Sequence, residues 1–257
     1  MQRTFATVGL RQSESRIAAD SQRYWTETGG TRWKADSHWQ DADVFDGDLW
    51  TRIGQRHLAM FERGARMVEF SRPWGRVVEW GCGGGANAVH FAKRCREFVG
   101  VDISAESLRE CGRQVAATSD AVFRPVLVEV GEPERAIELI GPGCDIFLCF
   151  YVFELVPSPE YGERLLLIAR DLLAPGGLAL IQIKYDEGRF WTRPRRRGYR
   201  SGVADMTTYP ISEFWQLAVK CGLRPESVEL VPKDDLDERY AYFLLSRPSA
   251  EENGFRL

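Results

Sequence analysis

Residues 77–85 read VVEWGCGGG, and this stretch shows how the chain is built. Two valines and an acid run into a cluster of glycines, and Ala86–Ala92 then favours a helix. A strand, a glycine turn and a helix N-terminus let backbone N–H groups approach a ligand closely. Gly81–Ala86 also fits the G-x-G-x-x-G/A pattern of dinucleotide sites, although glycine turns occur for steric reasons alone. The neighbouring residues decide which kind of ligand is predicted.

Two acids flank this turn in the sequence. Glu79 precedes the first glycine by two residues, and Asp102 ends a second predicted strand, 98–102. A carboxylate at Glu79 would repel a pyrophosphate but would pair with an ammonium group. Asp102 is placed to accept hydrogen bonds from a ribose diol. Together the two acids predict a ligand that is a nucleoside with an amino-acid tail.

With these residues the sequence resembles the class I S-adenosylmethionine-dependent methyltransferases. Five segments are similar to the family's motifs, in its order and spacing, within residues 70 to 245: 77–85, 101–103, 130–132, 145–154 and 172–181. The resemblance implies S-adenosyl-L-methionine as cofactor. By motif position it also implies the cofactor-binding residues Glu79, Gly81, Gly83, Gly85, Asp102, Ile103, Glu132 and Phe150.

Each of these residues has an expected place along the cofactor. Glu79 would lie near the methionine ammonium, and the three glycines would line the methionine and the ribose. Asp102 would accept from the ribose hydroxyls while Ile103 packs on the adenine. Glu132 would lie by the adenine amine, a position for which Glu129 and Glu134 compete.

Strand and helix patterns alternate along the chain and predict an α/β fold with a doubly wound, mostly parallel sheet. The resemblance implies seven strands, the last of them antiparallel. Strands are expected at 77–80, 98–102, 126–130, 145–150, 178–183, 228–231 and 240–245. Helices are expected at 14–25, 48–70, 86–95, 104–115, 161–173 and 212–221, with Ser104 and Ser212 as N-caps.

We expect two parts: residues 1–70 as an N-terminal helical lid or extension, and residues 71–257 as the methyltransferase domain. Tryptophans 25, 33, 39 and 50 would suit a lid, because aromatic walls hold sugars or flat rings. The alternative is that they anchor an additional helical layer to the core.

Three residues are candidates for the catalytic step: Glu154, Tyr151 and His38. Glu154 and Tyr151 follow the fourth strand, where the family commonly faces its substrate, and His38 stands beside Trp39 in a loop-like stretch. A general base has to lie within hydrogen-bond reach of the acceptor. Packing explains the other two histidines better, His57 on an apolar helical stripe and His90 within a helix.

Six arginines and three aromatic residues lie within residues 189–200, after the fifth strand. From this segment we expect four substrate-binding residues: Arg189, Trp191, Arg197 and Tyr199. They would suit a phosphorylated or carboxylated small molecule, or an RNA backbone with stacked bases. The alternative is a solvated surface loop. No metal is expected, since Leu155 stands where some family members carry the histidine of a Glu-His pair.

The composition narrows the class of protein. A chain of 257 residues with 44% hydrophobic and 28% charged residues is ordinary for a globular protein. A net charge of −3 argues against a surface that is one large nucleic-acid footprint. Six cysteines without a C-x-x-C pair indicate reduced thiols and a cytoplasmic location. No signal peptide and no membrane span is expected.

The sequence therefore predicts a methyltransferase that acts on a small-molecule acceptor, an acidic or glycosidic one, through a hydroxyl group. Nucleic acid is disfavoured as a partner, and an oligomer is compatible with the sequence. Two alternatives stay open: a methyltransferase acting on RNA or protein, and a non-catalytic relative or NAD-type Rossmann protein.

Overall fold

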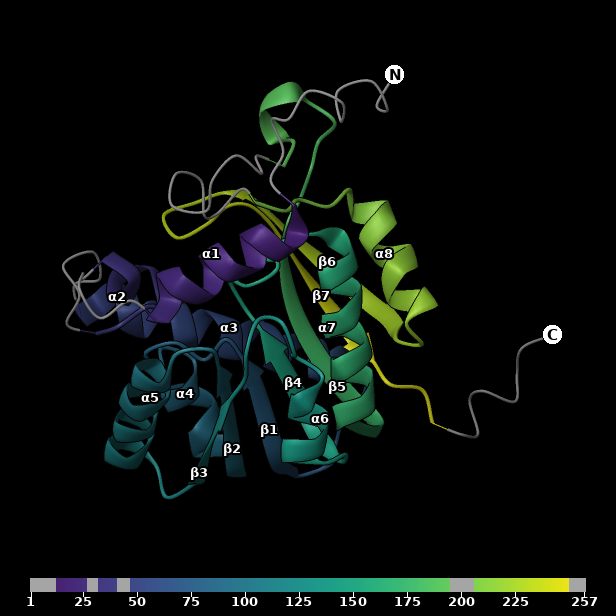
Figure 1. Ribbon diagram of the computed structural model, residues 1–257. Coiled ribbons are helices and arrows are strands. Elements are labelled where there is room, and N and C mark those ends of the chain that lie inside the picture. Colours follow the sequence, from purple (N-terminus) through teal and green to yellow (C-terminus); the bar gives the residue numbers. More distant parts are fainter. Residues whose placement is uncertain (1–12, 27–31, 41–46, 195–205, 250–257) are drawn as a thin grey trace.

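The computed structural model describes residues 13–26, 32–40, 47–194 and 206–249. Its centre is a seven-stranded sheet with the strand order β3-β2-β1-β4-β5-β7-β6, in which β7 runs antiparallel to the six other strands (Figure 1). The strands are β1 (Trp74–Trp80), β2 (Cys95–Asp102), β3 (Val122–Leu127), β4 (Cys144–Cys149), β5 (Leu173–Lys184), β6 (Arg224–Lys233) and β7 (Glu238–Ser246). The expected doubly wound, mostly parallel fold is confirmed.

Helices cover both faces of the sheet and cross one edge of it. They are α1 (Glu14–Thr26), α2 (Arg32–Asp36), α3 (Gly47–Met67), α4 (Ala88–Phe91), α5 (Ala105–Thr118), α6 (Arg135–Ile140), α7 (Pro159–Leu172) and α8 (Ile211–Lys220), with 3-10 turns η2 (Ala92–Arg94) and η3 (Phe190–Thr192). One face carries α3, α4 and α5, and the other carries α6, α7 and α8. Helix α1 runs over the carboxyl ends of the parallel strands (Figure 1).

Alternate residues of β1 point to opposite faces of the sheet, and their side chains are buried on both faces. Val77 lies in the core cluster that holds Phe61 of α3, whereas Val78 lies in the cluster that holds Leu165 of α7. Both valines are fully buried, as expected for a central parallel strand. This double burial holds β1 at the centre of the sheet, and Glu79 lies at its carboxyl end, next to the glycine turn.

Several elements differ from the sequence prediction. Strand β3 begins at Val122 rather than 126, because Pro125 is tolerated in an edge strand, and residues 128–130 continue beyond the sheet. Helix α4 is a single turn, so Cys95 begins β2 instead of closing a helical stripe. Ser212 is not the N-cap of α8, because the helix begins at Ile211 with Pro210 in that place. The short α6 was not expected.

The N-terminal helices do not form one unit. Met60, Phe61 and Ala65 of α3 pack into a core cluster of the sheet, whereas Ile17 of α1 and Trp33 of α2 belong to a separate cluster over the strand ends. A boundary after residue 70 stays a prediction.

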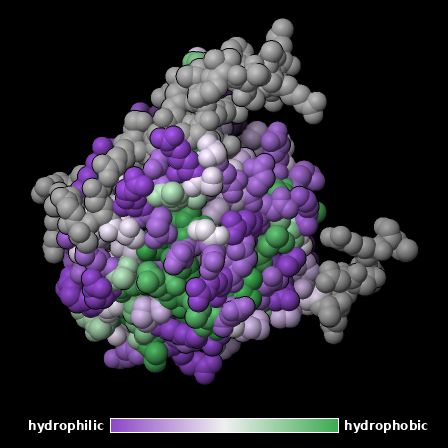
Figure 2. All heavy atoms as spheres, in the orientation of Figure 1, coloured by the Kyte–Doolittle hydropathy of each residue, from purple (hydrophilic) through white to green (hydrophobic). Residues whose placement is uncertain are grey.

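Most of the face shown in Figure 2 is hydrophilic, and hydrophobic residues gather near its middle. Among the helices of the described residues, none has the length and apolar content that crossing a bilayer requires.

Candidate functional site

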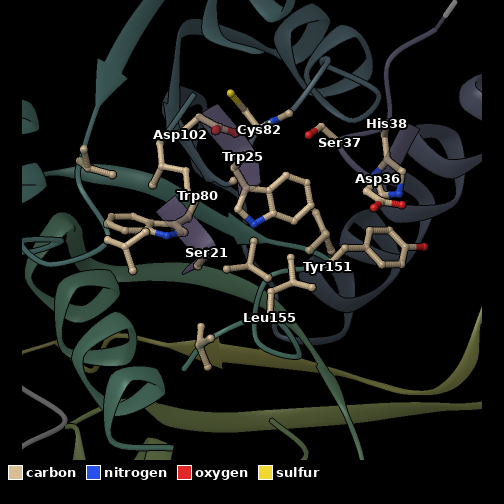
Figure 3. Close-up of a pocket in the computed structure, with 18 of the residues that line it drawn as sticks. Ser21, Trp25, Asp36, Ser37, His38, Trp80, Cys82, Asp102, Tyr151 and Leu155 are labelled. Atoms are coloured by element: carbon tan, nitrogen blue, oxygen red, sulfur yellow. Dashed lines mark hydrogen bonds between the residues drawn. The ribbon is translucent and has the colours of Figure 1, made fainter. Parts of the chain in front are cut away.

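A cavity of about 110 Å³ opens at the carboxyl ends of β1 and β4, where the strand order reverses (Figure 3). Ligands of open α/β sheets bind at such a switch point. Seven residues expected at the site line this cavity: His38, Gly81, Gly83, Asp102, Ile103, Phe150 and Tyr151. Helices α1 and α2 and the turn after them supply the opposite wall, with Ser21, Trp25, Asp36, Ser37 and His38.

Each glycine of the turn is required for a different structural reason. Gly81 and Gly83 have φ of 75° and 51°, in the left-handed region that favours glycine. A Cβ on Gly83 would lie 2.4 Å from the carbonyl oxygen of Ser37, so the wall after α2 lies directly on the turn. Gly85 does not line the cavity. Its φ is 92°, and it lies against Cys111 of α5, which allows that helix to pack closely.

Asp102 is held rigidly at the end of β2. Its Oδ2 accepts from the backbone N–H of Gly83 at 3.0 Å, and its Oδ1 accepts from that of Ser104 at 2.8 Å. Burial raises the pKa of Asp102, and these backbone hydrogen bonds oppose the rise. The carboxylate is thereby oriented at the cavity wall, where a hydroxyl group could donate to it.

Glu79 lies just behind the cavity wall and is 1% exposed. Asn87, which lines the cavity, donates from Nδ2 to Oε1 of Glu79 at 2.8 Å, and Oε2 of Glu79 has no hydrogen-bond partner. Burial raises the pKa of Glu79 to about 8, against the lowering effect of the Asn87 hydrogen bond. A buried carboxyl group with one unpartnered oxygen suits a cationic ligand, since burying its charge alone is costly. The residue therefore fits an ammonium-bearing cofactor.

His38 and Tyr151 meet at the cavity in strained conformations. Their φ angles are 54° and 53°, and their rings meet edge to face at 4.7 Å. Such backbone strain costs on the order of 1–3 kcal/mol and tends to cluster at functional sites. The carbonyl oxygen of His38 accepts from the indole N–H of Trp50 at 2.7 Å, which holds the segment in place. Burial lowers the pKa of His38 to about 4, so its imidazole is neutral at pH 7.

Tyr151 is fixed at both ends. Its backbone N–H donates to Oε1 of Gln182 at 2.6 Å, and its hydroxyl donates to Oδ1 of Asp237 at 2.8 Å. Burial raises the pKa of Tyr151 well above its usual range. The phenol is therefore a neutral wall residue, and its hydroxyl points away from the middle of the cavity (Figure 3).

Other expected site residues are not brought to the cavity. Glu154 is buried beside β7, where its Oε1 accepts from the hydroxyl of Tyr240 at 3.0 Å, and burial raises its pKa to about 7. Glu132 is exposed, and its Oε2 lies 3.6 Å from Nη1 of Arg135. From this part of the chain, Val128 and Val130 line the cavity instead.

The expected substrate residues are only partly described. Trp191 is 58% exposed, and the guanidinium of Arg189 lies 5.5 Å from the centre of its ring, outside the cavity lining. Arg197 and Tyr199 lie outside the described residues. Across the parts of the chain that the structure describes, no cluster of three or more His, Cys, Asp or Glu side chains could hold a metal ion.

Comparison with known proteins gives one family and many similar folds. Residues 52–226 match the family model described as a methyltransferase domain. The N-methyltransferase NodS from Bradyrhizobium japonicum WM9, in complex with S-adenosyl-L-homocysteine, is 13% identical with a TM-score of 0.61, over 85% of this chain and 98% of that one.

Magnesium protoporphyrin IX methyltransferase from Synechocystis PCC 6803, with bound S-adenosylhomocysteine, is 14% identical with a TM-score of 0.62, over 90% of this chain and 99% of that one. A structure from echinomycin biosynthesis is 15% identical with a TM-score of 0.54, over 77% of this chain and 83% of that one. No curated protein matches the sequence.

Proposed function

The chain belongs to the class I S-adenosylmethionine-dependent methyltransferases, and on that premise we propose that it transfers a methyl group to a hydroxyl of a small molecule, such as a sugar or a natural product. The observation that carries this proposal is the partly covered cavity, in which the backbones of Ser37 and His38 lie on the glycine turn and the ring of His38 meets Tyr151. A site roofed in this way favours a small acceptor over a folded macromolecule. Two similar structures, the magnesium protoporphyrin IX methyltransferase and the one from echinomycin biosynthesis, are linked to small molecules, which supports this class of acceptor.

The cofactor-binding roles follow from the residues around the glycine turn. We assign the ammonium of the cofactor to Glu79 and its ribose hydroxyls to Asp102, with Ile103 and Phe150 against its flat and apolar parts. When bound, the cofactor supplies an electrophilic methyl group on its sulfonium. The protein's contribution is then to orient an acceptor in line with that group and to exclude water.

His38 is the proposed proton acceptor for the hydroxyl. It lines the cavity, and its neutral imidazole has one nitrogen that can accept a proton. Tyr151 is less suited as a base because its hydroxyl already donates to Asp237. Glu154 is assigned no catalytic role, since its carboxyl lies beside Tyr240 rather than in the cavity.

The test is the variant His38→Asn, assayed against a panel of hydroxylated metabolites and sugars. Asparagine tolerates the left-handed backbone of position 38, so the fold should be kept. Loss of a general base should lower kcat by about 10²–10⁴-fold, while calorimetry should show S-adenosylhomocysteine binding within about twofold of wild type. An unchanged kcat would remove His38 from this role.

The alternative of an RNA or protein acceptor draws on one observation, the exposed Phe190 and Trp191 beside Arg189. If every small acceptor in the panel is inert while transfer RNA is methylated, with a steep salt dependence of binding, the alternative is correct.

A further inference from the structure

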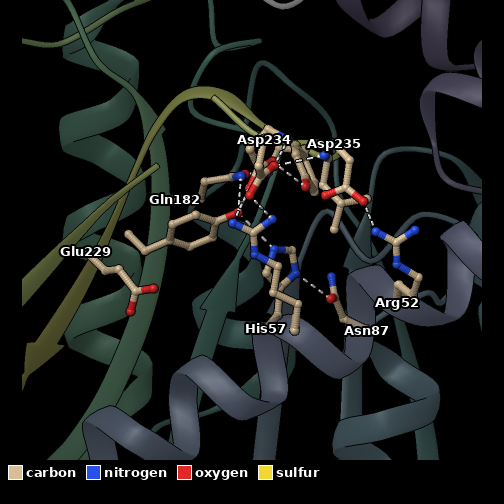
Figure 4. A network of polar contacts seen from close by, with 12 residues as sticks. Arg52, His57, Asn87, Gln182, Glu229, Asp234 and Asp235 are labelled. Carbon is tan, nitrogen blue, oxygen red and sulfur yellow. Dashed lines mark hydrogen bonds and ion pairs between the residues drawn. The ribbon is translucent and has the colours of Figure 1, made fainter. Parts of the chain in front are cut away.

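His57 of α3 is fully buried behind the cavity wall, at the centre of a polar network (Figure 4). Its ring stacks on Phe150, with 4.1 Å between ring centres and 8° between planes. Its Nδ1 lies 2.7 Å from Oδ1 of Asn87, and its Nε2 lies 3.1 Å from the hydroxyl of Tyr242. His57 thus contacts two residues that line the cavity, although it does not line the cavity itself.

The direction of the hydrogen bonds follows from Asn87. Its amide NH₂ donates to Oε1 of Glu79, so its carbonyl oxygen Oδ1 is an acceptor and the proton of that contact belongs to Nδ1 of His57. Burial lowers the pKa of His57 to about 3, which leaves a neutral ring with Nε2 as an acceptor.

The second contact of His57 is the weaker one. The single hydroxyl proton of Tyr242 faces two acceptors, Nε2 of His57 at 3.1 Å and Oδ2 of Asp237 at 2.6 Å. The shorter contact marks Asp237 as the main acceptor. The firm link from His57 therefore runs towards the glycine turn, through its Nδ1.

We propose that His57 is a positioning residue for the cofactor, which acts through Asn87 on Glu79. A side-chain amide is free to rotate by half a turn, and in the other orientation Asn87 would aim its carbonyl oxygen at the carboxylate. The N–H of His57 fixes the productive orientation, in which one oxygen of Glu79 is satisfied and the other is left for the cofactor's ammonium. The inference rests on the placement of that ammonium in the proposed function.

Two variants of nearly matched size separate the two contacts of His57. In His57→Asn the amide nitrogen takes the place of Nδ1 and can still donate to Asn87, whereas in His57→Gln the amide reaches the place of Nε2 and Tyr242. Both variants lose the stacking on Phe150. By calorimetry with S-adenosylhomocysteine, we expect His57→Asn to bind about tenfold more tightly than His57→Gln. Similar melting temperatures of the two variants would show that both fold equally well.

The variants His57→Asn and His57→Gln, each combined with Glu79→Gln, test whether His57 acts through Glu79. If His57 acts through Glu79, the tenfold difference between the two variants should shrink to about twofold or less, because coupled residues are not additive. Equal affinities in the original background, or an undiminished difference in the Glu79→Gln background, would overturn the role of His57 alone. If Glu79→Gln itself binds S-adenosylhomocysteine as tightly as wild type, the cofactor placement fails, and this inference fails with it.

Discussion

At the scale of single residues, Glu79 sets how cofactor binding depends on pH. Burial raises its pKa to about 8, so the free protein holds a proton on this carboxyl at neutral pH. An ammonium can pair only with the ionised form, so binding releases that proton. Affinity should therefore grow as the pH rises towards the pKa of Glu79.

We predict that S-adenosylhomocysteine binds more tightly at about pH 7.5 than at about pH 6, by up to tenfold per pH unit. In Glu79→Gln the affinity should be lower and nearly independent of pH over this interval. Glu132→Gln makes the same chemical change at an exposed acid outside the cavity, and its binding should match wild type at each pH. A wild-type profile that is flat, measured by calorimetry in matched buffers, would contradict the assignment of Glu79.

A site residue can be predicted from the sequence when its hydrogen-bond partners lie close to it in the chain. It is missed or misplaced when those partners lie far away. Asp102 reaches the cavity because the strand end and the glycine turn fix it locally, through Gly83 and Ser104. Glu154 was expected at the site because it follows β4, but the chain there turns its carboxyl towards Tyr240 of β7. The sequence predicts a packing role for His57, because its partner Tyr242 lies 185 positions away and no local pattern indicates that contact.

At the scale of elements, the turn after α2 packs directly against the glycine turn after β1. The backbone N–H of Gly84 donates to the carbonyl of Ser37 at 2.8 Å, and a Cβ at position 84 would lie 2.7 Å from the carbonyl oxygen of His38. A glycine is needed at this point for close approach of two backbones. The aromatic content of the sequence predicts a lid, which stays a prediction, but it does not show which glycines the segment 37–39 touches.

We predict that Gly84→Ala lifts the segment 37–39 from the turn. Backbone amides of residues 32–40 should then exchange hydrogen faster than in wild type, as measured by mass spectrometry. Gly131→Ala is the control, since a Cβ there meets nothing within 4 Å. Equal exchange in Gly84→Ala and wild type would show that the two backbones are not in the contact described.

Element boundaries were predicted less well than element order. The apolar runs of β1, β4 and β5 were found because these strands are buried on both faces. Strand β3 was placed too late because Arg124 and Pro125 interrupt its pattern, which an edge strand permits. The short α6, with only Ala136 and Ile140 buried, gives too few periodic positions to be recognised.

At the scale of the whole molecule, buried ionisable groups make folding stability depend on pH. Burial raises the pKa of Glu79 to about 8 and that of Glu154 to about 7, from 4.5. Their contribution to stability is present below about pH 4.5 and is lost as the pH rises through these raised values. The lowered pKa values of His38 and His57, about 4 and about 3, act in the opposite sense but only below the unfolded value of 6.5.

Above pH 6.5 the raised pKa values of Glu79 and Glu154 set the direction of this balance. We predict that, without cofactor, the melting temperature falls between about pH 6.5 and pH 8, when followed by calorimetry at constant ionic strength. The double variant Glu79→Gln and Glu154→Gln should show a smaller fall over the same interval. A melting temperature that rises with pH in the wild type would mean that these carboxyls are ionised in the folded protein at pH 6.5.

The hydrogen-bonded pair of His57 and Tyr242 joins the first third of the sequence to its last strand. During synthesis, His57 is added to the chain long before Tyr242. The contacts of Tyr242 with Gln182 and Asp237 can therefore form only after β7 has been synthesised. A chain that ends before Tyr242 would keep the sequence motifs that hold Glu79 and Asp102 and would lack the contacts of Tyr242 with His57, Gln182 and Asp237.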